Sequence, residues 1–220
     1  MARRKKAPDL PRHVVIEGPI GVGKTTLARA LGTRFGARVV LEEVEENPFL
    51  PRFYRDPEAF GFQTQMFFLL SRYRQQQDLR QPDLFQRSTV SDYLFQKDRI
   101  FAHLNLGAHE LALYEKVYQM LDVRIPPPDL VVYLQARTEV LMQRVRTRAR
   151  DWERPITADY LERLSAAYAD FFFRYEQSPL LVVNTSDIDI VEREEDLEDL
   201  IAAIRRMKKG VQVYNPFVRG

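Results

Sequence analysis

The sequence has no cysteine and only three histidines among its 220 residues. The lack of cysteine excludes disulfide bridges, thiolate metal sites and a cysteine nucleophile. His13, His103 and His109 show no spacing typical of zinc ligands, so zinc catalysis is not expected either. Long hydrophobic runs are lacking as well: Met66–Leu70 is one of the longest apolar stretches, whereas a membrane helix needs roughly 20 such residues. We therefore expect no membrane span.

An excess of one charge is also missing, because 33 Lys and Arg residues face 31 Asp and Glu residues. This balance gives no general reason to expect a nucleic acid or a membrane as partner. The basic residues Arg3–Lys6 are not followed by the apolar stretch of a secretory signal, so we expect a cytoplasmic protein. The length and the 45% apolar content predict one globular domain over residues 12–220, preceded by a flexible basic tail over residues 1–11.

Short β-branched runs alternate with helical patterns along the chain, which predicts an α/β fold with a central parallel sheet of five strands flanked by helices. The expected strands cover residues 13–17, 37–41, 88–90, 129–134 and 180–183. The expected helices cover residues 24–35, 57–79, 93–104, 108–121, 138–149, 157–175 and 192–209.

A phosphate-binding loop is predicted between the first strand and the first helix. The segment GPIGVGKT, from Gly18 to Thr25, fits the Walker A pattern in the context that this pattern requires. Glycines let backbone N–H groups surround phosphate oxygens, and the helix N-terminus adds its positive dipole end. Lys24 would neutralise the β- and γ-phosphates of ATP, or of GTP, and the Thr25 hydroxyl would hold Mg²⁺. The expected nucleotide-binding residues here are Gly18, Gly21, Gly23, Lys24, Thr25 and Thr26.

The acceptor of the phosphoryl group is predicted from other segments. A GTPase or motor usually has an acidic residue after an apolar strand, but Asp129 precedes its apolar run, which favours a kinase of a small substrate. Glu42 and Glu43 follow the second strand, at the sheet edge where ligands bind. Only one of these two carboxylates can face the γ-phosphate, because neighbouring side chains on a strand point to opposite faces, and both could also be solvated loop acids.

Two further groups of polar side chains could contact ligands. Gln65 and Arg72 lie seven residues apart on a predicted helix, so they share a face and could read the polar edge of a base or form a solvated stripe. An arginine-rich segment follows, which could close over phosphates, form a solvated helix end or bind RNA. Its arginines are Arg144, Arg146, Arg148, Arg150 and Arg154.

Taken together, these segments resemble the deoxynucleoside kinase family, in particular its bacterial deoxyadenosine and deoxyguanosine kinase branch. The resemblance runs from about His13 to Asp199. It implies a three-layer P-loop kinase fold with an arginine-rich lid over about residues 144–156, and a homodimer packed through helices. The motifs that carry it are GPIGVGKTT, EEVEENPFLPRFY, FQTQMFFLLSRYR, RSTVSDYLF, PPPDLVVYL and RTRARDWERPITADYLERL.

The resemblance also implies roles for single residues. Glu42 would be the general base, and Lys24, Arg87 and Arg148 would stabilise the transferring phosphoryl group. The substrate site would include Glu42 and Arg87, with Tyr54 and Glu153 at the 3′-hydroxyl and Gln65, Arg72 and Asp92 at the base; Arg144 and Arg148 would approach the nucleotide.

One departure concerns Mg²⁺, because Gln86 stands before Arg87 and Ser88 where most relatives have an acid. A neutral amide is a poorer ligand for a hard cation, so either Thr25 with water suffices or a carboxylate such as Glu42 or Asp92 contributes. The implied reaction moves the γ-phosphoryl group of ATP to the 5′-hydroxyl of a deoxynucleoside. Polar matching predicts purine deoxynucleosides first, deoxycytidine second and thymidine poorly. The alternatives are a nucleoside monophosphate kinase similar to thymidylate kinase and a non-catalytic nucleotide- or RNA-binding module.

Overall fold

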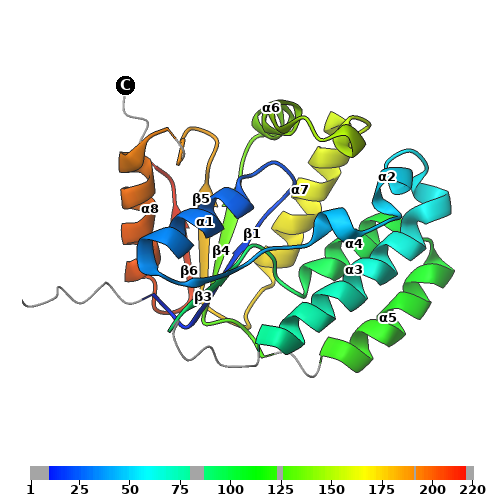
Figure 1. The fold of residues 1–220 in the computed structure, drawn as a ribbon, viewed down its shortest axis with the longest axis horizontal. Helices are drawn as coiled ribbons and strands as arrows, with labels where there is room; N and C mark the ends of the chain where they lie inside the picture. The colour runs from blue at the N-terminus through cyan, green and yellow to red at the C-terminus, as the bar shows by residue number, and fades with distance from the viewer. Residues whose placement is uncertain (1–9, 80–86, 123–125, 191, 217–220) are drawn as a thin grey trace, which may run out of the picture.

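The strands of this chain are short and rich in valine, leucine and isoleucine, and they assemble into one parallel sheet. A computed structural model describes residues 10–79, 87–122, 126–190 and 192–216 (Figure 1). The strand order is β2-β3-β1-β4-β5-β6, and every neighbouring pair is parallel. The strands are β1 (His13–Glu17), β2 (Arg38–Val40), β3 (Thr89–Ser91), β4 (Leu130–Gln135), β5 (Leu180–Asn184) and β6 (Val211–Tyr214).

The predicted α/β class is confirmed, but the prediction of five strands is wrong because the described residues form six. The additional strand β6 pairs with β5, from Leu180 opposite Val211 to Val183 opposite Tyr214. Gly210 turns the chain into it with a φ of 71°, a backbone conformation that glycine adopts without steric cost. The predicted basic tail over residues 1–11 lies almost entirely outside the described residues.

Helices cover both faces of the sheet, as expected for parallel strands. In Figure 1, α1 and α8 lie on one face and α4 and α7 on the other, with α3 and α5 forming a further layer beyond α4. The predicted helix over residues 93–104 begins only at Lys97, and the last helix is shorter at both ends than predicted. The helices are α1 (Lys24–Phe35), α2 (Leu50–Phe53), α3 (Pro57–Leu79), α4 (Lys97–Asn105), α5 (Ala108–Asp122), α6 (Thr138–Arg148), α7 (Ala158–Phe173) and α8 (Glu194–Arg206), with short 3₁₀ turns η1 (Val44–Glu46) and η2 (Asp151–Glu153).

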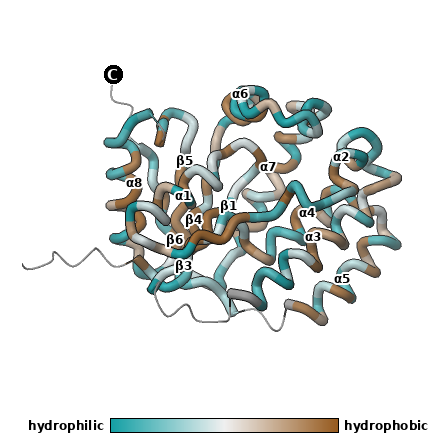
Figure 2. The backbone as a smooth tube through the Cα atoms, in the orientation of Figure 1, coloured by the Kyte–Doolittle hydropathy of each residue, from teal (hydrophilic) through white to brown (hydrophobic). Residues whose placement is uncertain are grey.

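The main hydrophobic core lies between the sheet and its helices. Figure 2 shows the apolar residues concentrated along the central strands, where Val14, Val15 and Ile16 of β1 are buried. A second cluster joins α3, α4 and α5 around Leu69 and Tyr114. No helix within the described residues is both long and apolar enough to cross a membrane.

This topology brings loops that are distant in the sequence to one edge of the sheet. Because all strands run in the same direction, the segments that follow β1, β2, β3, β4 and β5 emerge at their shared carboxyl edge. The glycine-rich loop follows β1, Glu42 follows β2 and Asp92 follows β3. The arrangement of the strands therefore determines where the polar side chains meet.

Candidate active site

The glycine-rich loop wraps around the side chain of its own lysine. Gly21 and Gly23 have φ angles of 84° and 103°, and a Cβ on Gly21 would lie 2.8 Å from the carbonyl oxygen of Leu141. Lys24 Nζ donates hydrogen bonds to the carbonyl oxygens of Gly18 at 2.6 Å and Pro19 at 3.0 Å. Burial, followed by repulsion from Lys97, lowers the pKa of Lys24 to about 8. Phosphate oxygens would favour the charged form of this lysine again.

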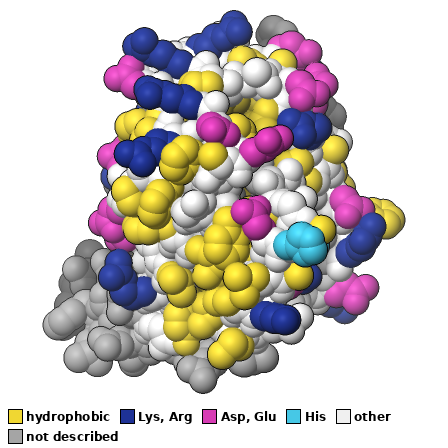
Figure 3. Space-filling model, turned by 90° about the vertical axis from the view of Figure 1, so that its right-hand side faces the viewer, with side chains coloured by type: hydrophobic (Ala, Val, Ile, Leu, Met, Phe, Trp, Pro, Cys, Tyr) yellow, Lys and Arg dark blue, Asp and Glu magenta, His cyan; other side chains and the backbone are white. Residues whose placement is uncertain are grey.

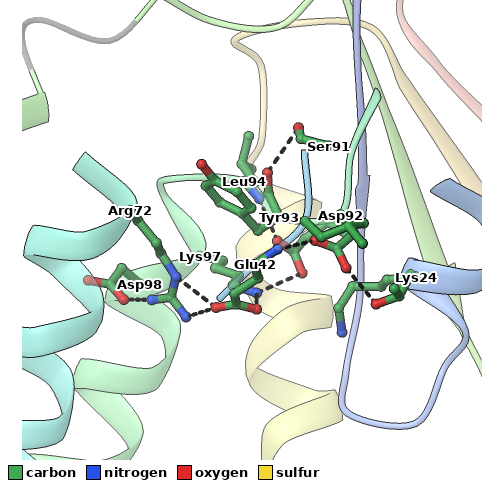
Figure 4. Close-up of polar contacts among 12 residues, drawn as sticks. Lys24, Glu42, Arg72, Ser91, Asp92, Tyr93, Leu94, Lys97 and Asp98 are labelled. Carbon is green, nitrogen blue, oxygen red and sulfur yellow. Dashed lines mark hydrogen bonds and ion pairs between the residues drawn. The ribbon is translucent and has the colours of Figure 1, made fainter. Parts of the chain in front are cut away.

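Asp92 connects the first helix to the segment after β2. Its Oδ2 atom accepts a hydrogen bond from the Thr25 hydroxyl at 2.5 Å, and its Oδ1 atom accepts one from the backbone N–H of Glu42 at 2.7 Å (Figure 4). The carboxylate is 4% exposed. A hydroxyl and a carboxylate thus lie together beside the phosphate-binding loop.

Glu42 is the centre of a buried network of charges. Arg72 donates to Glu42 Oε1 through two of its nitrogens, and Lys97 Nζ donates to Oε2 at 2.7 Å (Figure 4). Arg72 also forms an ion pair with Asp98, which accepts a hydrogen bond from the Tyr114 hydroxyl at 2.9 Å. Burial alone would raise the pKa of Glu42, but the charges and hydrogen bonds of Arg72 and Lys97 hold it well below its ordinary value. Glu42 is therefore ionised at neutral pH.

Helix α3 presents polar groups close to this network. Gln65 is 2% exposed, and among the residues that the structure describes its Oε1 atom has no hydrogen-bond partner, nor does the buried hydroxyl of Thr64. The guanidinium of Arg72 lies 4.6 Å from the centre of the Phe68 ring. Buried polar atoms are costly unless they are paired, so a ligand with matching groups would be favoured here.

The arginine-rich segment lines the same cleft as α3. Arg148 at the end of α6 donates to Glu153 Oε2 at 3.1 Å and to Oε1 at 2.6 Å, and Glu153 is 5% exposed. Arg150 lies 3.3 Å from Glu45, which belongs to the segment after β2. Burial raises the pKa of Tyr54 well above its ordinary value, and the charge of nearby Glu153 adds to this effect. The predicted partners of the 3′-hydroxyl, Tyr54 and Glu153, thus lie near each other.

Arg144 has other partners than Arg148 and Arg150 of the arginine-rich segment. Its guanidinium donates to the carbonyl oxygens of Val22 at 3.3 Å, Thr185 at 2.8 Å and Ile188 at 3.4 Å. These contacts fasten the segment after β5 to the phosphate-binding loop. Arg144 therefore holds the segment after β5 in place where it lines the cleft beside the phosphate-binding loop.

A single cleft of about 1200 Å³ joins these groups. This volume exceeds the range of roughly 300–1,000 Å³ that is usual for one small-molecule site, so the cleft has room for two ligands. It brings together most of the site residues predicted from the sequence. These are Gly21, Gly23, Lys24, Thr25, Thr26, Glu42, Tyr54, Gln65, Arg72, Asp92, Arg144, Arg148 and Glu153.

The structure does not bring Arg87 to this cleft. Arg87 is exposed and precedes β3, so it lies at the amino edge of the sheet, opposite the carboxyl edge where the cleft opens. Gln86, where the sequence departs from the family pattern, lies outside the described residues. The prediction that Arg87 contacts the phosphoryl group is therefore corrected.

Asp92 lies beside the phosphate-binding loop and not at the predicted base site. Two charged residues of this network were also missed from the sequence alone. Asp92 contacts Thr25 and the backbone of Glu42, while Asp98 is the carboxylate that pairs with Arg72. Lys97, which bonds to Glu42, was not predicted either. Both missed residues belong to the segment SDYLFQKD, in which the charged residues that follow a short strand are a usable signal.

A glycine-rich loop between a strand and a helix, with a cleft that ends in a buried carboxylate, defines a P-loop phosphotransferase.

The deoxynucleoside kinase family model matches residues 14–209. A deoxyguanosine kinase of Bacillus subtilis is 36% identical over 199 residues, which cover 88% of this chain and 96% of the relative. A deoxyadenosine kinase of Dictyostelium discoideum is 36% identical over 182 residues, which cover 80% of this chain and 73% of the relative.

Solved structures show the same fold. A deoxyadenosine kinase from M. mycoides, solved with dATP bound, has a TM-score of 0.77 and 24% identity and aligns over 87% of this chain and 98% of that chain. The chain therefore belongs to the deoxynucleoside kinase family, as its resemblance indicated.

Proposed function

We propose that this chain transfers the γ-phosphoryl group of ATP to the 5′-hydroxyl of a purine deoxynucleoside, in nucleotide salvage in the cytoplasm. The observation that carries the proposal is that Lys24 and the ionised Glu42 line one cleft. Relatives with deoxyguanosine and deoxyadenosine kinase activity in their names support the substrate class.

In the proposed mechanism Glu42 binds the 5′-hydroxyl and receives its proton. A carboxylate with a strongly lowered pKa is a weak base. The transition state of phosphoryl transfer is loose in most analyses, so the attacking oxygen becomes acidic only when its bond to phosphorus has largely formed. Glu42 would therefore first orient the hydroxyl and then accept its proton late in the reaction. Arg72 and Lys97 keep the carboxylate ionised and fixed for this role.

Mg²⁺ would be held by the Thr25 hydroxyl and Asp92. Their oxygens lie 2.5 Å apart beside the phosphate-binding loop, and both are donor types that suit a hard cation. Among the described residues there is no group of three or more His, Cys, Asp or Glu side chains that could hold a metal ion. This fits Mg²⁺, which usually binds through one or two protein ligands together with water and substrate phosphates. The ion would neutralise the charge of the phosphates.

The donor phosphates would lie against the glycine-rich loop. The first N–H groups of α1 have no partners inside the helix and point toward the loop, where they favour an anion. Lys24 adds a positive charge there, and Arg148 at the end of α6 would approach from the lid. The donor base would lie against the segment after β5 that Arg144 holds. ATP is the proposed donor, and GTP is the alternative.

The acceptor base would lie against α3. The buried Oε1 of Gln65 needs a donor, and exocyclic amino groups of adenine, guanine and cytosine supply one. Thymine has no exocyclic amino group and carries a carbonyl oxygen, an acceptor, where cytosine has its amino group. An unpaired buried group costs about 1–3 kcal/mol. The proposed order is therefore purine deoxynucleosides first, deoxycytidine second and thymidine last.

A panel of acceptors with labelled ATP and Mg²⁺ tests this proposal. We expect phosphorylation of deoxyadenosine or deoxyguanosine at the highest rate and of thymidine at the lowest rate. Deoxyadenosine monophosphate, assayed beside deoxyadenosine, tests the alternative of a nucleoside monophosphate kinase. Preference for the monophosphate, or for thymidine among the nucleosides, would contradict the proposal, and salt-sensitive RNA binding without turnover would indicate a binding module instead.

A further inference from the structure

Lys97 is a buried cation at the floor of the cleft that the sequence motifs did not single out. It is the first residue of α4 and only 2% exposed, and it lines the cleft together with Lys24 and Glu42. Its Nζ atom donates to Glu42 Oε2 at 2.7 Å and lies 3.9 Å from Glu17 Oε1. A buried ammonium group needs such partners, because an isolated charge is strongly disfavoured away from water.

Glu17, the nearby second anion, is fixed by other groups. Its Oε1 atom accepts hydrogen bonds from the backbone N–H of Gly18 at 2.8 Å and from the Tyr168 hydroxyl at 3.0 Å. Its Oε2 atom accepts one from the backbone N–H of Leu94 at 2.7 Å. The carboxylate therefore ties the glycine-rich loop to α7 and to the segment before α4. It provides a fixed negative charge that holds Lys97 close to the phosphate-binding loop.

The hydrogen bonds of Lys97 leave donor capacity for a ligand. An ammonium group has three N–H donors, and within the described ranges Nζ makes one hydrogen bond, to Glu42. The remaining donors belong to a side chain that lines the cleft. Oxygen atoms that enter the cleft beside Glu42 would meet them.

We propose that Lys97 is a catalytic residue that binds the equatorial oxygens of the phosphoryl group during its transfer, from the acceptor side of the cleft. This inference rests on the proposed function. The phosphoryl group must travel between the attacking oxygen at Glu42 and the leaving oxygen at Lys24, and Lys97 lies close enough to both that its charge acts on each. Lys97 thereby fills the role that the family resemblance implied for Arg87, which is at the opposite edge of the sheet.

The chemical step is balanced without further reactants. A bond forms between the 5′-oxygen and the γ-phosphorus, and the bond from that phosphorus to the β,γ-bridging oxygen breaks, so that its electron pair leaves with ADP. The proton of the 5′-hydroxyl moves to Glu42. Negative charge spreads over the equatorial oxygens during this transfer, and a positioned ammonium group stabilises it.

The first test compares three variants at the same helix. Lys97→Met removes the charge, Lys97→Arg retains it, and Arg99→Met removes a 47% exposed cation two residues further along α4. We expect Lys97→Met to lower kcat by about 10²-fold or more while the KM for the deoxynucleoside changes little. Lys97→Arg should recover much of this loss, and Arg99→Met should match the parent. Thermal melting shows whether each variant is folded.

The second test asks whether Lys97 acts only by positioning Glu42. The change Lys97→Met is repeated in a Glu42→Gln background. If Lys97 binds the phosphoryl group, its loss lowers kcat further, by about tenfold or more, even without the carboxylate. An unchanged kcat in this background would overturn the inference and make Lys97 a positioning residue.

The activity of the parent protein separates the role of Lys97 from the proposed function. If the parent protein phosphorylates no deoxynucleoside, the proposed function fails. If the parent is active and Lys97→Met is equally active, only the assignment of Lys97 fails. A large loss with Arg87→Met and none with Lys97→Met would return the role to Arg87.

Discussion

At the residue scale, the carboxylate of Glu42 should determine the rate of phosphoryl transfer. Glu42→Gln keeps the size of the side chain and removes the proton acceptor. Because general-base catalysis contributes about 10²–10⁴-fold, kcat should fall by this range while binding of the deoxynucleoside is retained. Steady-state kinetics and calorimetric titration with deoxyadenosine measure the two quantities.

The neighbouring Glu43 provides the matched comparison, because it also lines the cleft. Equal rates for Glu42→Gln and the parent would refute the role of Glu42. If Glu43→Gln were the damaging change instead, the base would be Glu43, the alternative that the strand geometry left open.

The sequence predicted the residues of the cleft best where a motif fixed their position. Lys24 and Thr25 follow directly from the Walker A pattern, and Gln65 and Arg72 follow from helical spacing. The segment after β3 was harder, because residues 93–96 are not helical and α4 begins only at Lys97. No motif marks Lys97 and Asp98, and the non-helical segment before α4, not a helical period, determines that they reach Glu42 and Arg72. For this reason Lys97 and Asp98 were missed.

At the scale of elements, the loop after β1 depends on close contact with α6. A Cβ on Gly21 would lie 2.8 Å from the Leu141 carbonyl oxygen and 2.9 Å from Val145 Cγ2, and the φ of 84° disfavours any L side chain. We therefore expect Gly21→Ala to lower the free energy of unfolding by about 1–3 kcal/mol and to weaken ATP binding. Urea denaturation and nucleotide titration measure these effects.

Gly107→Ala is the control for this substitution, because a Cβ there would meet Glu110 Oε2 only at 4.0 Å. Gly21→Ala would contradict the argument if it were as stable as Gly107→Ala and bound ATP as the parent does.

The first strand contains a histidine whose protonation opposes folding. His13 begins β1, and its Nε2 atom lies 3.0 Å from the Ser91 hydroxyl of β3. Burial lowers the pKa of His13 below 6.5, and the charge of Asp129 offsets only part of this effect. The unfolded chain therefore binds a proton more readily, so stability is lost as the pH falls below 6.5 toward the pKa of the folded state.

Urea midpoints at about pH 7.5 and about pH 5.5 test this expectation. His13→Gln retains a donor for Ser91 and removes the titration, so the drop in stability between the two pH values should become smaller. His109→Gln, at an exposed position of α5, should leave the drop unchanged. An equal drop in His13→Gln and the parent would contradict the role of His13.

The alternation of β-branched runs with helical patterns predicted the central strands of the sheet. The edge strand β6 was not predicted. The strands that pair on both sides, such as β1 and β4, have long buried runs that stand out in the sequence. Strand β6 is four residues long, and its Val211 and Val213 are exposed, so no buried apolar run marks it in the sequence. It pairs with β5 because the end of α8 brings the chain to that edge of the sheet. Only the assembled structure contains that information.

At the scale of the whole molecule, exposed apolar side chains indicate where a partner could bind. Hydrophobic side chains gather on the face of the molecule that Figure 3 presents, where they lie among scattered charges. Phe173 at the end of α7 is 89% exposed, and α4 and α7 line a groove of about 540 Å³ with Ile100, Leu104 and Phe171. Burial of a Phe side chain stabilises an interface by about 1.5–3 kcal/mol. We propose that a second copy of the chain covers this groove and forms the homodimer that the resemblance implied.

The proposed dimer predicts a particle with about twice the 25.9 kDa mass of the chain in light scattering or sedimentation. Phe173→Asp should shift the particle to the monomer mass, because a carboxylate at this exposed end of α7 would be costly to bury in an interface without a partner. Met120→Asp, which changes a 70% exposed residue on α5, is the matched control and should leave the mass unchanged. The groove shares no lining residue with the active-site cleft, so we expect the Phe173→Asp monomer to keep its ATP affinity. A monomeric parent would refute the dimer, and a dimer that survives Phe173→Asp but dissociates in Met120→Asp would move the interface to α5.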